Sequence, residues 1–164
     1  MRKFTPESAV DVIELQQLVA DWCHELDTNG GLDVAKLFTE DCIVDFGRVS
    51  YTGRAATTKF YQDRAERVRT QQKDGIRTQR HGITNIRIVF EGKDRAHVTF
   101  LIINFSGEGG PPLMNATTPT IVTDTRFECR HDTDGVWRIK AFYGTPIFIG
   151  NDPFLNQGMV GPKT

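Results

Sequence analysis

The sequence is poor in cysteine and has no excess of charge of either sign. It contains three cysteines, Cys23, Cys42 and Cys129, an odd number without a close pair. This usage argues against a disulfide framework or a four-thiolate zinc site. Lys plus Arg total 20 and Asp plus Glu total 21, so the chain lacks the basic excess of a dedicated nucleic-acid binder. We therefore expect no nucleic-acid partner.

Long apolar runs are also missing. No segment approaches the length that crosses a bilayer, and the N-terminus leads into an amphipathic stretch rather than an apolar signal core. Together with cysteines expected to be buried and free, these absences predict a cytoplasmic protein without a membrane partner. The four histidines show no paired metal-ligand spacing, so we expect no metal.

What the chain does have is the size and composition of one ordinary domain. Its 164 residues, 38% of them hydrophobic and 25% charged, can bury a core without disulfide or metal staples. We expect a single domain over residues 1–164, with a core at about 8–145. A tail at 146–164, rich in Gly and Pro, is expected to wrap over the body.

Helical patterns come first along the chain. Thr5 suits a helix cap and Pro6 the first helical position, and apolar residues then recur at three- and four-residue steps as far as Leu26. Paired glycines within 27–31 end this helix. A short second helix is expected at 32–39, a strand at 42–46, and a third helix from Arg54 to a break near 71–75.

The remaining sequence predicts β-structure. Strands are expected at 81–90, 95–106, 118–131 and 136–143, with hairpin turns at 91–94 and 132–135. This order predicts an α+β domain, in which a cone-shaped, curved antiparallel sheet wraps around the long N-terminal helix and two further helices. The open end of such a cone is a natural apolar pocket.

Two polar residues are candidates for chemistry in that pocket. Asp27 lies at the C-terminal end of the first helix, where a carboxylate is unfavourable beside the helix dipole, although Asp is also common in turns. His81 opens a strand on the face that it shares with Ile83 and Asn85. Because imidazole titrates near neutral pH, His81 suits a general base, but a strand-end histidine bonded to backbone fits equally well.

The order and spacing of five short motifs carry a resemblance to one family. In chain order they are Leu-Asp at 26–27, Leu-Phe-Thr-Glu-Asp-Cys at 37–42, Tyr-Thr-Gly-Arg-Ala-Ala at 51–56, His-x-x-x-Asn-Ile at 81–86 and Asp-Gly-Val-Trp-Arg-Ile at 134–139. Over about residues 8–145 the chain resembles the SnoaL-like branch of the nuclear-transport-factor-2-like, cystatin-like superfamily. It looks closest to the cofactor-free lyases of that branch, which include scytalone dehydratase, bile-acid 7α-dehydratase and hexachlorocyclohexane dehydrochlorinase.

The resemblance implies a cofactor-independent lyase or isomerase with an Asp–His dyad inside the cone. Asp27 and His81 stand at the family's two dyad positions. His81 would take a proton from an acidified carbon, while Asp27 would fix its tautomer and stabilise the imidazolium. Dehydratase- or dehydrohalogenase-like elimination, or isomerisation, would follow without a metal or organic cofactor. Relatives commonly pair through the open sheet face, which implies a homodimer or a homotrimer.

The chain also departs from the family pattern. Trp22 stands about where some members carry Lys or Tyr, and Ala141, Phe142 and Tyr143 occupy the region where many carry Arg. A middle-strand position that is acidic or His in some relatives falls near Asn104. The leaving-group chemistry of the known dehydratases is therefore not reproduced, and Tyr143 is left as the candidate additional proton donor.

Large apolar side chains near the cone predict a small hydrophobic substrate, although most of them must belong to the core. The expected substrate-binding residues are Trp22, Phe46, Tyr61, Asn104, Phe127 and Tyr143. Two alternatives to the lyase stay open. One is a non-catalytic small-ligand-binding or assembly module of the same fold. The other is a polyketide-type cyclase in which an acidic residue transfers the proton.

Overall fold

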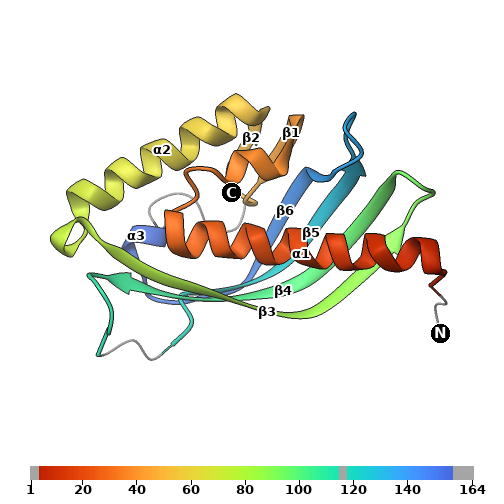
Figure 1. Cartoon of the computed structure of the whole chain (residues 1–164). Coiled ribbons are helices and arrows are strands. Elements are labelled where there is room, and N and C mark those ends of the chain that lie inside the picture. The colour runs from red at the N-terminus through yellow and green to blue at the C-terminus, as the bar shows by residue number, and fades with distance from the viewer. Residues whose placement is uncertain (1–3, 115–117, 157–164) are drawn as a thin grey trace.

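The computed structural model describes residues 4–114 and 118–156, in which a curved sheet wraps around one long helix (Figure 1). The helical elements are α1 (Pro6–Asn29), η1 (Val34–Leu37), α2 (Arg54–Gln71), η2 (Lys73–Gly75) and α3 (Pro153–Asn156). The strands are β1 (Phe38–Asp45), β2 (Ser50–Thr52), β3 (Arg77–Phe90), β4 (Arg95–Glu108), β5 (Ile121–His131) and β6 (Trp137–Ile149). The expected α+β cone is thus confirmed.

The six strands form one sheet in the order β2-β1-β6-β5-β4-β3. All neighbouring strands are antiparallel except β1 and β6, which pair in parallel. The sequence predicts a purely antiparallel sheet, so this parallel pair was not expected. Figure 1 shows α1 lying across the concave face of this sheet, with α2 and α3 near the C-terminal end of α1. None of the described helices is long and apolar enough to cross a membrane.

Local sequence signals explain both ends of α1. The Thr5 side chain accepts a hydrogen bond from the Ser8 backbone N–H, and the Ser8 side chain accepts one from the Thr5 backbone N–H, which forms a capping box around Pro6. At the other end Gly30 adopts a left-handed φ of 66° and donates to the Glu25 carbonyl. The helix therefore stops just after Asp27, which fixes that carboxylate at the edge of the sheet.

The core lies between α1 and the inner face of the sheet. Trp22 from α1 packs its ring against Phe127 of β5 and Phe142 of β6, with centroids 5.6 and 5.4 Å apart. Phe127 and Phe142 are themselves cross-strand partners, so one aromatic cluster joins the helix to two strands.

Several expected boundaries were wrong. The second helix, expected at 32–39, is a 3₁₀ turn at Val34–Leu37 followed directly by β1. The last strand, expected to end at 143, runs on to Ile149 through Gly144 and Pro146. Gly144 fits because a Cβ there would lie only 3.1 Å from the Phe142 ring. Pro146 lies beside a register shift between β5 and β6, where a proline, which has no backbone N–H to donate, is tolerated. The region expected to be tail therefore begins as ordered sheet.

Candidate active site

A cavity opens between α1, α2 and the inner face of the sheet, beside α3. It encloses a volume of about 110 Å³, with further space open to solvent. Its apolar wall includes Trp22, Leu26, Phe46, Phe60, Ile102 and Phe142. Its polar groups include Arg64, Arg77, Gln79, His81, Asn104 and Thr123. A largely aromatic wall with a few convergent polar groups suits an apolar ligand that carries polar substituents.

Asp27 and His81 are in direct contact at this cavity. The Asp27 Oδ1 atom lies 2.6 Å from His81 Nδ1, and Asp27 Oδ2 accepts the backbone N–H of His81 at 2.9 Å. The two side chains are only 11% and 8% exposed. Because both carboxylate oxygens bind the same residue, Asp27 fixes the imidazole in position as well as in orientation.

Asn104 contacts the opposite side of the imidazole. Its Nδ2 atom lies 2.9 Å from His81 Nε2. An amide nitrogen can only donate, so Nε2 accepts this bond and the ring proton resides on Nδ1, where it is donated to Asp27. His81 lines the cavity, and Nε2 carries the lone pair of this tautomer, so it can act as a base once the Asn104 amide releases its hydrogen bond.

Burial keeps two nearby acidic groups protonated. Desolvation, with a smaller contribution from the Asp27 charge, raises the pKa of the Cys23 thiol to about 12. Burial also raises the pKa of the Tyr61 phenol, against a smaller opposite effect of Arg64. Cys23 is therefore not a thiolate nucleophile, and Tyr61, which lines the cavity, remains a neutral hydroxyl.

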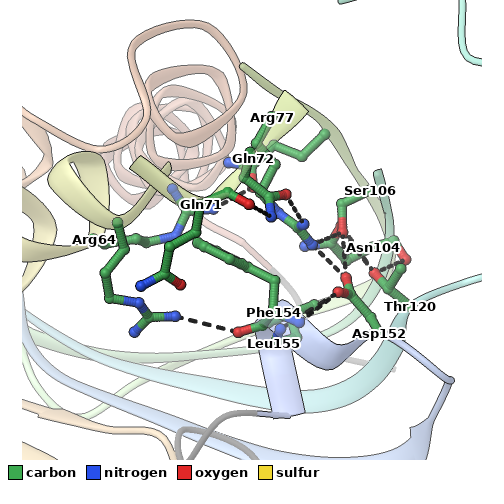
Figure 2. A network of polar contacts seen from close by, with 12 residues as sticks. Arg64, Gln71, Gln72, Arg77, Asn104, Ser106, Thr120, Asp152, Phe154 and Leu155 are labelled. Carbon is green, nitrogen blue, oxygen red and sulfur yellow. Dashed lines mark hydrogen bonds and ion pairs between the residues drawn. The ribbon is translucent and has the colours of Figure 1, made fainter. Parts of the chain in front are cut away.

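A polar network joins β3, β4 and the C-terminal segment at the cavity mouth (Figure 2). Arg77 forms an ion pair with Asp152, and their side chains are only 3% and 10% exposed. Ser106 accepts from Arg77 at 2.6 Å and donates to Asp152 at 3.3 Å. Asp152 also accepts the backbone N–H of Phe154 at 3.1 Å, which anchors the first turn of α3.

This anchored segment closes part of the cavity. The Phe154 ring is covered by the guanidinium groups of Arg67 and Arg77, at 4.7 and 4.6 Å from its centroid. The next residue, Leu155, lines the cavity. The described part of the tail, as far as residue 156, thus lies over this chain's own cavity, and residues 157–164 lie outside the described part of the chain.

We expect Asp152→Asn to lower the free energy of unfolding by about 3 kcal/mol, because it leaves the buried Arg77 charge without its partner. Urea denaturation would measure this change. The matched control is Asp63→Asn, which removes an exposed partner of Lys59 and should change stability by less than about 1 kcal/mol. Equal effects of the two substitutions would show that the Arg77–Asp152 pair does not hold the segment.

The structure brings most, but not all, of the expected site residues to the cavity. Trp22, Phe46, Tyr61 and Asn104 line it together with His81, and Asp27 lies directly behind His81. Their roles in binding and catalysis remain predictions.

Two residues that were expected to bind substrate do not line this cavity. Phe127 is completely buried in the aromatic core and does not line the cavity. Tyr143 lies on the outer face of the sheet opposite Arg126, because Phe142 points inward and successive strand residues alternate. Tyr143 is therefore not the additional proton donor of this site.

Sequence reasoning missed Arg64, Arg77, Gln79 and Leu155. The signal for two of them was the period of a strand, since Arg77 and Gln79 precede His81 by four and two residues and share its face. The expected start of this strand at 81 hid that pattern. Arg64 lies on α2, whose composition is mostly polar, and nothing in its sequence distinguishes it from Arg67 or Arg69.

One group of possible metal ligands occurs in the described part of the chain, away from this cavity. Asp11, Glu14 and His131 place ligand atoms within 4.8 Å of one another. Asp11 Oδ1 already accepts a hydrogen bond from Trp137 Nε1 at 2.9 Å, which gives the carboxylate a structural role.

A curved sheet wrapped around a long helix is the fold of the nuclear-transport-factor-2-like class of cystatin-like α+β proteins. A SnoaL-like domain model matches residues 7–143, and the chain belongs to the SnoaL-like family. No curated protein matches the chain.

Solved structures show the same fold. A scytalone dehydratase-like protein from Novosphingobium aromaticivorans is 20% identical with a TM-score of 0.72, over 97% of each chain. An NTF2-like protein with a cystatin-like fold from the same organism is 18% identical with a TM-score of 0.68, over 87% of this chain and 86% of its own. ActVI-ORFA from Streptomyces coelicolor is 13% identical with a TM-score of 0.71, over 87% of this chain and 98% of its own. At these identities the likeness establishes the fold alone.

Proposed function

We propose that the protein is a cofactor-independent lyase or isomerase that removes a proton from carbon in a small hydrophobic molecule, with His81 as the general base. The observation that carries this proposal is the buried Asp27–His81 contact beside a cavity that His81 lines. The family includes scytalone dehydratase-like proteins, which supports the same class of reaction.

In the proposed reaction, Asn104 releases its hydrogen bond to His81 Nε2, and this nitrogen takes a proton from a carbon beside a carbonyl or another electron-withdrawing group. The electron pair of the broken C–H bond forms a C=C bond, and a leaving group on the next carbon departs with the electron pair of its own bond to that carbon. In an isomerisation, the proton instead returns to a different carbon. Asp27 stabilises the imidazolium that forms, and the low exposure of the pair strengthens this interaction.

Two neutral donors line the cavity and can stabilise the developing negative charge. Asn104 Nδ2 has one hydrogen directed at His81 and a second available, and Tyr61 keeps its hydroxyl proton because burial raises its pKa. Among the described residues that line the cavity, none is acidic. The geometry therefore favours His81 as base over the carboxylate of a polyketide-type cyclase mechanism, and a binding module has no need of the Asp27–His81 pair.

The test uses simple ketones with acidic C–H bonds, so the natural substrate need not be known. We expect the wild-type protein to accelerate deuterium incorporation from D₂O into at least one of 2-indanone, 2-tetralone and 3-hydroxy-1-tetralone by about 100-fold or more over buffer, as positioned bases do. Proton NMR follows the exchange, and loss of water from the hydroxy compound gives an aromatic product. Exchange at the buffer rate for the whole panel would contradict the lyase proposal and favour a binding module.

A further inference from the structure

Arg64 is a cavity-lining cation whose guanidinium has no carboxylate partner in the described part of the chain. Its Nη2 donates to Gln79 Oε1 at 2.6 Å, and Gln79 in turn donates to the Leu26 carbonyl. The acidic residues of α2 pair elsewhere, Asp63 with Lys59 and Glu66 with Arg69. One carboxylate near the cluster, Asp152, is paired with Arg77.

The surroundings of Arg64 carry an excess of positive charge. Three guanidinium groups, from Arg64, Arg67 and Arg77, lie within 5.9 Å of the Phe154 ring centroid, and Asp152 is the carboxylate bound to one of them. Burial lowers the pKa of Arg64, and the charges of Arg77 and Arg67 lower it further, against Tyr61 and Asp152. A partly desolvated guanidinium in such a field is stabilised by any anion that enters the cavity.

Arg64 and His81 line the same cavity. Gln79, which holds the guanidinium, and His81 face the same side of β3 two residues apart, which is about 7 Å along a strand. Aromatic and aliphatic side chains, including Trp22, Phe60 and Ile102, line the rest of the cavity. A ligand of one to three fused rings can therefore contact the guanidinium at one end and Nε2 at the other.

We propose that Arg64 determines the substrate class of this cavity by binding the carboxylate of an otherwise apolar, aromatic-sized molecule. Guanidinium binds carboxylate through two parallel N–H donors, and Gln79 accounts for one of the five donors of Arg64. The anion supplies the partner that Arg64 lacks, and the contact places the carbon skeleton beside His81. This inference deepens the proposed function and rests on it for the reaction, but binding of the carboxylate can be measured separately.

The test compares carboxylates with their neutral amides. Benzoate, 2-naphthoate and 9-anthracenecarboxylate are titrated by calorimetry against benzamide, 2-naphthamide and 9-anthracenecarboxamide. The His81→Asn variant, which carries no imidazole at this position, removes a histidine cation as a rival site. We expect at least one carboxylate to bind about 10- to 100-fold more tightly than its amide, the size of a charged hydrogen-bonded contact.

Variants assign that preference to one residue. Arg64→Gln should bring the carboxylate-to-amide ratio close to one while leaving amide binding nearly unchanged, and Arg64→Lys should restore part of it. Arg67→Gln is the matched control, because Arg67 contacts Phe154 but does not line the cavity, and it should keep the wild-type ratio. A purely structural Arg64 would weaken both ligands equally, which the ratio detects.

Three results would overturn the proposal. They are a wild-type ratio near one, a preference that survives Arg64→Gln, and the absence of binding by all three carboxylates at millimolar concentration. The lyase proposal fails separately, through the exchange assay. His81→Asn should abolish exchange but keep the carboxylate preference, so the two failures are distinguishable.

Discussion

Replacement of His81 by asparagine should slow deuterium exchange into the best carbon acid by about 100-fold or more, to the buffer rate, because the contribution of a positioned general base is lost. Asparagine is close to histidine in size and can still donate to Asp27 Oδ1, so the cavity keeps its shape. It has no basic nitrogen at the position of Nε2, and the proton of the substrate has no acceptor there.

The matched control is His24→Asn, which changes an exposed histidine one turn before Asp27 on the same helix. This variant should exchange at the wild-type rate. Thermal unfolding of both variants checks that the fold is intact, and binding of 2-naphthoate checks that the cavity still accepts a ligand. If His81→Asn keeps the wild-type exchange rate, His81 is not the base, and the Asp27–His81 contact has only a structural role.

Local chemistry made the elements of this fold predictable where a residue type permits one geometry. Thr5, Pro6 and the glycines after Asn29 specify the ends of α1 because capping and left-handed backbone have narrow requirements. The four long strands follow from alternation and from turn residues. Their order in the sheet does not, since the parallel pairing of β1 with β6 joins segments about a hundred residues apart, and no local signal specifies it.

The errors in β6 have two physical causes, which are tertiary contacts that override local preference and the alternation of the two faces of a strand. Glycine and proline usually interrupt strands, yet Gly144 fits inside β6, where a Cβ would lie only 3.1 Å from the Phe142 ring. Tyr143 was misplaced because a shift of one residue reverses the face of a strand. Neighbouring residues of one strand therefore cannot both be assigned to a cavity.

The candidate site was only partly readable from the sequence. Asp27 and His81 came from the motif resemblance, because each residue alone suits an ordinary structural role. The cavity-lining arginine of α2, Arg64, could not be identified from the sequence. This helix is polar throughout, and only the contact of Arg64 with Gln79 of β3 distinguishes it from the other arginines of α2. Likewise, Leu155 reaches the cavity only because the Asp152 carboxylate anchors α3 over the mouth.

Asp27→Asn should slow the same exchange by about 100-fold or more, toward the buffer rate, while leaving the shape of the cavity intact, as expected when an orienting carboxylate is made neutral. The reason lies in the two oxygens of Asp27, both of which accept hydrogen bonds from His81, one from Nδ1–H and one from the backbone N–H. An amide offers one acceptor and one donor. The fixed backbone N–H claims the acceptor, so the amide Nδ2–H faces the imidazole and donates to His81 Nδ1.

That donation moves the ring proton to Nε2, where it occupies the position from which the base must act. Long-range ¹H–¹⁵N spectra distinguish the two tautomers, and we expect His81 to change from Nδ1–H in the wild type to Nε2–H in Asp27→Asn. The control is Asp21→Asn, which alters an exposed carboxylate on α1 whose partner is Gln17 and should change neither the tautomer nor the rate. If the tautomer changed at an undiminished rate, proton transfer would not pass through His81 Nε2. If the rate fell with the tautomer unchanged, Asp27 would act through its charge on the imidazolium rather than by selecting the basic nitrogen.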